Sequence, residues 1–231
     1  METDLVLSSG FLAFARQTGV LSAVEDTGLQ VGGVCGTSSG ALAGALWCAG
    51  HSATTIAEKL SAQTPLSMLR PGVHIWRGLF GMGAVVEQLR AWLPPTFADL
   101  ERPLGVGVMD AEGRSILLHQ GSLPEAVAAS CAIPWLFQPI DIGGVLYRDG
   151  GVVDRTGLSA WRAWRGKRPT VLHLVERTGG AVVEEASISP DLSVIHTAKS
   201  GARFWNLGDF WKQHAEAYRS ASEVLLGQAN G

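Results

Sequence analysis

A serine between two glycines, Gly36-x-Ser38-x-Gly40, is the first feature of this sequence that could carry out chemistry. Apolar and β-branched residues precede it and very small residues follow it, so the serine falls where a strand gives way to a helix. This setting is typical of a nucleophile elbow, because the glycines let neighbouring backbone pass close. Amides at the start of the helix would favour negative charge there. A glycine-rich turn or a phosphate cradle without chemistry is the alternative.

A nucleophilic serine needs a base, and histidine is the usual one. The histidines downstream of the serine are His51, His74, His119, His173, His196 and His214. None of them lies in a loop that resembles a catalytic signature. His173 stands inside an apolar run, residues 171–175, which favours a hydrogen-bonded core histidine. A triad that contains histidine is therefore the weaker hypothesis.

An aspartate offers the second choice of base. Asp149 follows a predicted strand, residues 145–148, and precedes Gly150 and Gly151, which permit a sharp turn. The carboxylate is expected at the sheet edge where the serine turn also opens. A free aspartate has a pKa near 3.9 and is a weak base, so it would have to be desolvated and contact the hydroxyl directly. A plain Asp-Gly-Gly turn is the alternative interpretation.

Strand and helix patterns alternate along the chain, which predicts a sheet with helices packed on its faces. Strands are expected at residues 4–7, 29–35, 104–109, 114–118, 145–148, 171–175 and 192–195. Helices are expected at about 10–26, 39–49, 53–61, 85–93, 124–131, 158–164 and 210–226. Residues 64–83 combine proline, glycine and bulky apolar side chains without a sustained period, so they are interpreted as a lid or loop insertion.

Composition excludes several classes of protein. With 231 residues, 46% of them hydrophobic, the chain can bury a full core, and residues 1–231 are taken as a single domain. A net charge of −3 argues against a nucleic-acid partner. Cys35, Cys48 and Cys131 are scattered, which predicts reduced and mostly buried thiols without a disulfide framework or a metal site. An acidic start and apolar runs well short of 20 residues predict a cytoplasmic protein.

Four segments in order resemble the patatin-like phospholipase family. They are residues 5–10 with 19–21, residues 36–40, residues 129–134 (Ala-Ser-Cys-Ala-Ile-Pro) and residues 149–151. The resemblance covers about Leu5 to Val153. It implies a three-layer α/β/α sandwich around a mostly parallel central sheet, and a Ser-Asp dyad that hydrolyses acyl esters of lipids without a metal or cofactor. By position, Ser38 would be the nucleophile and Asp149 the base.

Two positions depart from the family pattern. The family's first loop has three glycines, then Arg or Lys one residue later, whereas this chain has Ser9-Gly10-Phe11-Leu12-Ala13-Phe14. The amides of Gly10 and Phe11 are still expected to form the oxyanion hole, in which one lost donor costs about 2.7–4 kcal/mol. Ala13 stands at the position of the missing cation, and Arg16 is considered as its replacement. After the dyad aspartate, Arg155 and Gly157 stand where Asn and Pro are usual.

The resemblance implies a serine lipid acyl hydrolase of the phospholipase A, lysophospholipase or carboxylesterase type, acting through an acyl-enzyme on Ser38. A catalytically weak lipid-binding or interaction protein, favoured by the altered loop, is one alternative, and an acyltransferase that uses the same serine is another. A lipid or acyl ester substrate is expected, and the apolar residues 76–82 are a candidate mouth for an acyl chain. Peripheral membrane contact through the basic and aromatic residues 161–168 is weighed against a solvated helix end with buried tryptophans. The oligomeric state stays open.

Overall fold

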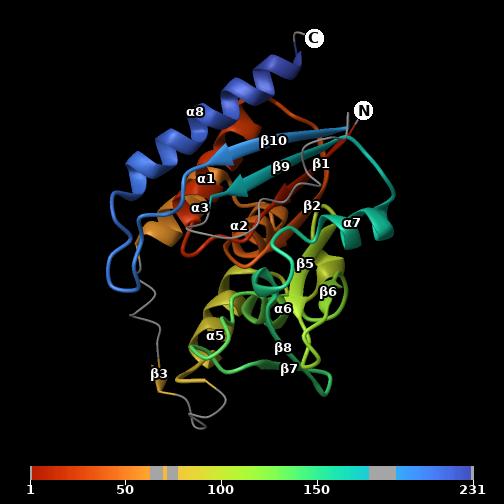
Figure 1. Ribbon diagram of the computed structural model, residues 1–231, viewed down its shortest axis with the longest axis vertical. Helices are drawn as coiled ribbons and strands as arrows, with labels where there is room; N and C mark the ends of the chain where they lie inside the picture. The colour runs from red at the N-terminus through yellow and green to blue at the C-terminus, as the bar shows by residue number, and fades with distance from the viewer. Residues whose placement is uncertain (1, 63–69, 72–77, 177–190, 230–231) are drawn as a thin grey trace.

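The computed structural model describes residues 2–62, 70–71, 78–176 and 191–229 (Figure 1). The main sheet comprises β1 (Thr3–Leu7), β2 (Val31–Thr37), β5 (Leu104–Met109), β6 (Ser115–Leu118), β7 (Ile140–Ile142), β8 (Val145–Asp149), β9 (Thr170–Val175) and β10 (Leu192–Thr197). A separate short pair is formed by β3 (Arg70–Pro71) and β4 (Phe80–Gly81). The helices are α1 (Phe14–Asp26), α2 (Ser39–Cys48), α3 (Ala53–Ser61), α5 (Gly83–Trp92), α6 (Leu123–Ser130), α7 (Leu158–Arg165) and α8 (Phe210–Ala229). Two 3-10 turns lie at Phe97–Asp99 and Gly150–Val152.

The centre of the main sheet is parallel, as expected. The strand order is β10-β9-β1-β2-β5-β8-β7, with β6 also paired to β5. Strands β10, β9, β1, β2 and β5 run parallel, while β6, β8 and β7 join antiparallel. Because β1 and β2 are parallel neighbours, the loops after Leu7 and after Thr37 leave the same edge of the sheet. This edge is where ligands bind in open α/β sheets.

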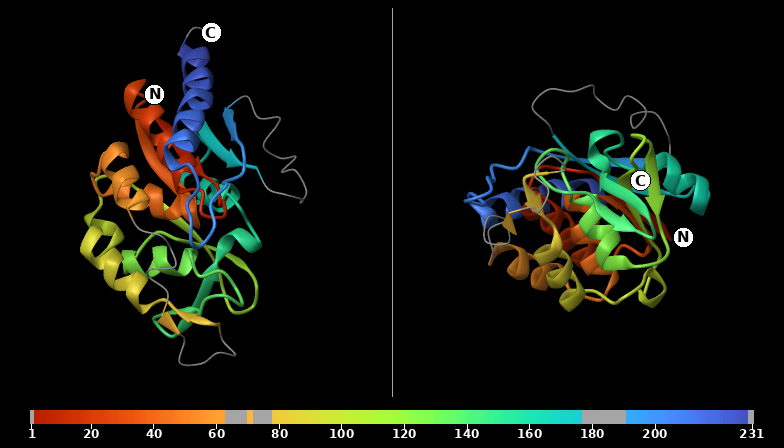
Figure 2. Two further views of the ribbon diagram at one scale, coloured as in Figure 1. Left: turned by 90° about the vertical axis from the view of Figure 1, so that its left-hand side faces the viewer. Right: turned by 90° about the horizontal axis from the view of Figure 1, so that it is seen from below.

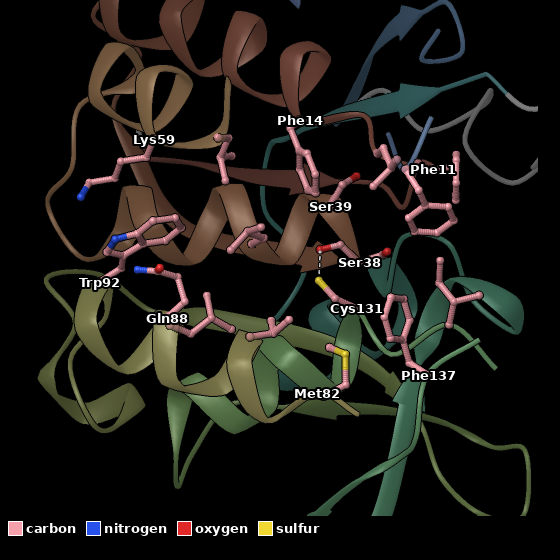
Figure 3. Close-up of a pocket in the computed structure, with 18 residues that line it drawn as sticks. Phe11, Phe14, Ser38, Ser39, Lys59, Met82, Gln88, Trp92, Cys131 and Phe137 are labelled. Carbon is pink, nitrogen blue, oxygen red and sulfur yellow. Dashed lines mark hydrogen bonds between the residues drawn. The ribbon is translucent and has the colours of Figure 1, made fainter. Parts of the chain in front are cut away.

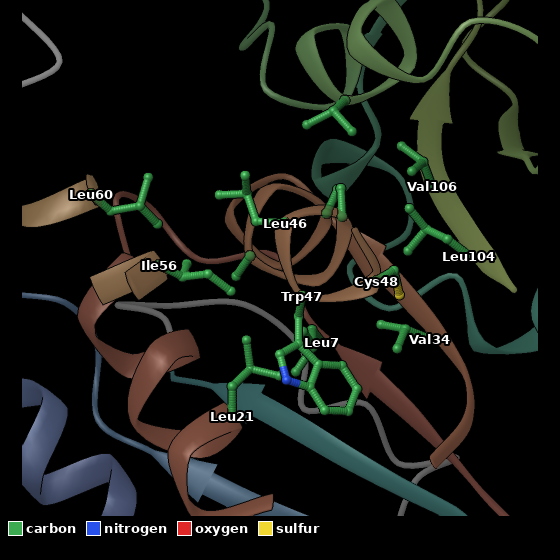
Figure 4. Packing of buried hydrophobic residues seen from close by; sticks show 14 of the residues in the cluster. Leu7, Leu21, Val34, Leu46, Trp47, Cys48, Ile56, Leu60, Leu104 and Val106 are labelled. Carbon is green, nitrogen blue, oxygen red and sulfur yellow. The ribbon is translucent and has the colours of Figure 1, made fainter. Parts of the chain in front are cut away.

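Helices cover both faces of this sheet, which confirms the three-layer α/β/α arrangement (Figure 2). On one face, α2 packs against α1 and α3, and Figure 4 shows Leu46 of this helix toward Ile56 and Leu60 of α3 and Trp47 beside Leu7 of β1. On the other face, α7 inserts the fully buried Trp161 against Val6 of β1 and Leu172 of β9. The sheet is therefore buried on both sides, as a parallel sheet requires.

The basic and aromatic segment 161–168 belongs to this packing. The Trp161 indole donates to Asp4 Oδ2 at 2.8 Å, and Arg165 donates to the Gly32 carbonyl at 3.0 Å. Arg162 forms an ion pair with Asp191. Burial of a tryptophan, the alternative named for this segment, is thus confirmed for Trp161.

Several boundaries differ from the sequence prediction. Strand β2 begins two residues later than expected and continues to Thr37, because its last residues pair with β1 and β5. Strand β7 was not predicted, since three residues beside a Gly143-Gly144 turn carry too short a pattern. Most of the expected lid, residues 64–69 and 72–77, lies outside the described residues. In the described part of the chain, no helix is long and apolar enough to cross a bilayer.

Candidate active site

Ser38 lies in a strained turn between β2 and α2. Its φ of 55° and ψ of −119° are rare for a residue with a side chain, and such strain is common at functional sites. A Cβ on Gly36 would lie 2.5 Å from the Gly40 carbonyl oxygen, and a Cβ on Gly40 would lie 2.2 Å from the Leu7 carbonyl oxygen. Both glycines are therefore required by close backbone contacts around the serine.

The structure brings Ser38 and Asp149 together. Ser38 Oγ donates to Asp149 Oδ2 at 2.7 Å, and the aspartate is only 5% exposed at the end of β8. The other oxygen, Oδ1, accepts from the Gly151 amide at 2.8 Å, which fixes the rotation of the carboxylate. A Cβ on Gly150 would lie 2.7 Å from the backbone of Gly107, so this turn packs directly on β5. The aspartate is held as a buried acceptor for one hydroxyl.

Two neighbours of the serine, Ser130 and Cys131, were not given a role at the site by the sequence. Ser130 Oγ accepts from the Ser38 amide at 2.8 Å and donates to the Gly107 carbonyl at 2.6 Å, which ties the strained turn to β5. The Cys131 thiol donates to the Ser38 carbonyl at 3.5 Å. Burial, with the nearby charge of Asp149, raises the pKa of Cys131 far above its ordinary value, so the thiol stays neutral. Both residues lie in the segment 129–134, one of the four segments that resemble the patatin-like phospholipase family.

The first loop runs beside the serine and is held by Arg155. The Ser9 amide donates to the Arg155 carbonyl at 2.7 Å, and the Arg155 guanidinium donates back to the Ser9 carbonyl and to the Val175 carbonyl. Gly10 and Phe11 line the same pocket as Ser38. Within the described part of the chain, no protein group accepts a hydrogen bond from the amides of Gly10 and Phe11. Both amides are therefore available to a ligand.

Arg16 does not replace the missing cation, so this expectation is wrong. Its guanidinium donates to Glu216 at 2.7 Å and to the Gln213 carbonyl at 3.1 Å, both on α8. The residue is 5% exposed and lies outside the pocket. Arg16 lies in the first turn of α1, and its side chain is directed toward α8. Arg16 fastens α1 to α8.

His173 is a core histidine, as its apolar surroundings predicted. It is fully buried, and its ring nitrogens contact Gln17 Oε1 at 2.8 Å and Thr197 Oγ1 at 2.7 Å. Burial, followed by the charge of Arg16, lowers the pKa of His173 to about 3. The Gln17 amide group in turn donates to the Ser8 carbonyl at 2.8 Å, so the network supports the first loop without contacting Ser38.

An apolar pocket opens from the serine (Figure 3). Met82, the described end of the segment expected to receive an acyl chain, lies in its wall. The walls come from the first loop and from helices α2, α3 and α5; they include Leu12, Phe14, Leu42, Leu60, Met82, Val85, Leu89, Trp92, Ile133, Phe137 and Phe204. On the Asp149 side, a second and more polar groove is lined by Val152, Glu176, Lys199 and Ser200. Ser38 stands where the two meet. Among the described residues, no group of His, Cys, Asp and Glu could hold a metal ion.

Comparison with known proteins shows the family to which the chain belongs. Residues 5–160 match the family described as patatin-like phospholipase, and the chain belongs to that family. An uncharacterized NTE family protein of Mycobacterium tuberculosis is 29% identical over 154 residues, 65% of this chain and 42% of its own length. The uncharacterized protein YqhO of Bacillus subtilis is 31% identical over 206 residues, 74% of this chain and 70% of its own. The chain thus spans less than half the length of the mycobacterial relative.

Solved structures share the fold at low sequence identity. VipD from Legionella pneumophila superposes with a TM-score of 0.58 at 14% identity, covering 99% of this chain and 67% of that one. The type III effector protein ExoU superposes with a TM-score of 0.56 at 15% identity, covering 98% of this chain and 53% of that one. These likenesses extend the family's fold over the residues beyond the match.

Proposed function

We propose that this protein is a serine lipid acyl hydrolase in which Ser38 is the nucleophile and Asp149 is the base. The observation that carries the proposal is the 2.7 Å hydrogen bond from Ser38 Oγ to a buried carboxylate, where the serine lines an apolar pocket. Membership of the patatin-like phospholipase family supports a lipid substrate. No metal or cofactor takes part in the proposed steps.

Acylation begins when Ser38 Oγ attacks the ester carbonyl and its proton passes to Asp149 Oδ2. The Gly151 amide keeps the carboxylate aligned through Oδ1. The negative charge on the carbonyl oxygen is stabilised by the amides of Gly10 and Phe11, together with the N-terminus of α2. Collapse of this intermediate releases the alcohol, which takes the proton from Asp149, and leaves the acyl group on Ser38.

Deacylation repeats the same chemistry with water. Asp149 accepts a proton from a water molecule, the hydroxide attacks the acyl-enzyme, and the proton returns to Ser38 as the fatty acid leaves. An alcohol in place of water would give a new ester, which makes an acyltransferase the first alternative. Both reactions share one acyl-enzyme, so product analysis separates them.

A lipid-binding protein with little turnover is the second alternative. It is favoured by the first loop, where Leu12 has a φ of 48° and Ala13 stands in place of a cation. A loop that positions its amides poorly would lose about 2.7–4 kcal/mol for each missing donor. The pocket would then still bind an acyl chain.

We also propose that the mouth of the site contacts lipid surfaces. Trp135 is 87% exposed, although its neighbours Ile133 and Phe137 line the pocket. Phe11, which lines the pocket on the other side, is 50% exposed and stacks edge-on with Phe204. Exposed aromatic side chains beside an apolar entrance are suited to the boundary between water and lipid. A cytoplasmic location stays a prediction of the sequence.

The experiment is an assay of product release by the purified protein and its Ser38→Ala variant. Lysophospholipids, phospholipid vesicles and p-nitrophenyl esters are supplied with and without glycerol, and fatty acids and new esters are measured by mass spectrometry. The proposal predicts fatty acid from wild type alone. If folded wild type releases no product, while it and Ser38→Ala bind a fluorescent fatty acid equally, the protein is a lipid binder.

A further inference from the structure

We infer that the apolar pocket is a ruler that holds a single acyl chain along α5 and ends at Trp92. This inference rests on the proposed function and adds the chain length that the site selects. Met82, Val85, Leu89 and Trp92 all line the pocket, at spacings of three, four and three residues. Such spacings form one stripe on a helix, so the pocket follows α5 from its first residue to its last.

The opposite wall is apolar over the same length. Leu42 of α2 and Leu60 of α3 face the stripe, and Leu60 is 7% exposed. Figure 3 shows Trp92 and Lys59 at one end of the lining, Phe11 and Phe137 at the other, and Ser38 and Met82 between them. A chain esterified to Ser38 Oγ that lies along the α5 stripe passes Met82 and extends toward Trp92. A long, narrow and apolar space suits an unbranched hydrocarbon chain.

Near Trp92 the lining of the pocket includes polar groups as well as apolar ones. Lys59 Nζ lies 5.2 Å from the centre of the Trp92 ring, and the side chain of Gln88 lines the pocket nearby. The distance from Met82 to Trp92 along the helix is about 15 Å, at about 1.5 Å per residue. An extended chain advances about 1.3 Å per carbon for a C–C bond of about 1.52 Å, so about 12 carbons fill it. Longer chains must pass an ammonium group and an amide.

The length of the apolar part predicts how kcat/KM depends on the length of the acyl chain, because each buried methylene adds to binding. Each methylene that enters the apolar part contributes about a fourfold gain in binding. Carbons beyond Trp92 reach polar groups and contribute little. We therefore expect kcat/KM on p-nitrophenyl esters to rise with chain length from 4 carbons to about 12 and then to stop rising.

Blocking the middle of the pocket tests the ruler. Val85→Trp adds an indole about one turn of α5 beyond Met82, where it leaves space for a short chain only. Ala91→Trp is the matched control, because Ala91 is on the same helix but exposed to solvent. Val85→Trp should lower the ratio of kcat/KM on the 12-carbon ester to kcat/KM on the 4-carbon ester about a hundredfold or more. Ala91→Trp should reproduce the wild-type profile.

A second variant opens the far end. Trp92→Ala removes the ring but keeps the backbone carbonyl, which His51 Nε2 contacts at 3.0 Å, so the helix end is retained. Its activity should keep rising past about 12 carbons. If neither Val85→Trp nor Trp92→Ala changes the length profile while both unfold at wild-type temperatures, the ruler is refuted.

Binding separates this inference from the proposed chemistry. In a Ser38→Ala background, saturated fatty acids of 6 to 16 carbons displace a fluorescent fatty acid, and the affinity should level off at about 12 carbons. If wild type hydrolyses no ester but this pattern and its loss in Val85→Trp are seen, the ruler stands and the hydrolase fails. If hydrolysis occurs with no levelling of affinity, the hydrolase stands and the ruler fails.

Discussion

Buried His173 should make the protein unstable to mild acid. Its pKa is lowered to about 3 by burial, whereas a histidine in the unfolded chain titrates near 6.5. Between these values the unfolded chain binds a proton that the folded protein does not. The contribution of neutral His173 to the free energy of unfolding is therefore fully present above pH 6.5 and declines as the pH falls. The decline is about 1.4 kcal/mol per pH unit, or about 2 kcal/mol by pH 5.

Urea unfolding followed by tryptophan fluorescence measures this decline at pH 7.5, 6.5, 5.5 and 5.0. The variant His173→Gln lacks the titrating ring but can still hydrogen-bond to Gln17 and Thr197. Carboxylates that titrate in the same range affect both proteins equally, so the comparison isolates the histidine. The free energy of unfolding of the variant should fall less steeply than that of wild type, by about 1.4 kcal/mol per pH unit. Parallel curves for the two proteins would refute the reasoning.

Three further predictions concern the serine turn and the mouth of the site. Ser130→Ala should lower the free energy of unfolding by about 1–3 kcal/mol in urea titrations, because it removes the hydroxyl that accepts from the Ser38 amide and donates to the Gly107 carbonyl. Gly40→Ala should lower Tm strongly, since its Cβ would lie 2.2 Å from the Leu7 carbonyl oxygen, whereas Gly83→Ala, with open space around it, should raise Tm slightly. Trp135→Ser should weaken binding to phospholipid vesicles in sedimentation assays and leave hydrolysis of a soluble short-chain ester unchanged.

Each of these predictions has an outcome that contradicts it. A Ser130→Ala protein as stable as wild type would mean that water replaces the hydroxyl without loss. Equal Tm values for Gly40→Ala and Gly83→Ala would show that α2 can move away from β1. Vesicle binding that survives in Trp135→Ser would place the lipid contact elsewhere on the surface.

The parts of the fold that depend on local pattern could be predicted from the sequence. The hairpin of β5 and β6 was readable from two apolar runs around Asp110-Ala111-Glu112-Gly113. Helix α2 was readable from small residues after the serine turn. Strand β7 was missed because its pairing with β8 comes from tertiary context, which a three-residue pattern does not encode.

In the candidate site, too, local sequence predicts some features, whereas others depend on residues far apart along the chain. Ser38 and Asp149 could be named because glycines stand on both sides of the serine and follow the aspartate, and the structure explains these glycines by close contacts. Their separation of 2.7 Å depends on the antiparallel pairing of β8 with β5, which no local pattern reveals. Arg16 was misjudged because its partners on α8 are some 200 positions away along the chain. Long-range partners are where sequence reasoning fails here.

The central claim, that Asp149 activates Ser38, is tested most directly by labelling with a fluorophosphonate probe. Wild type, Ser38→Ala and Asp149→Asn are labelled over time, and the modified peptide is identified by mass spectrometry, which separates Ser38 from its neighbour Ser39. We expect modification of Ser38 in wild type, none in Ser38→Ala, and a rate about a hundredfold or more lower in folded Asp149→Asn. Labelling of Asp149→Asn at the wild-type rate, or modification of a different serine, would contradict the account.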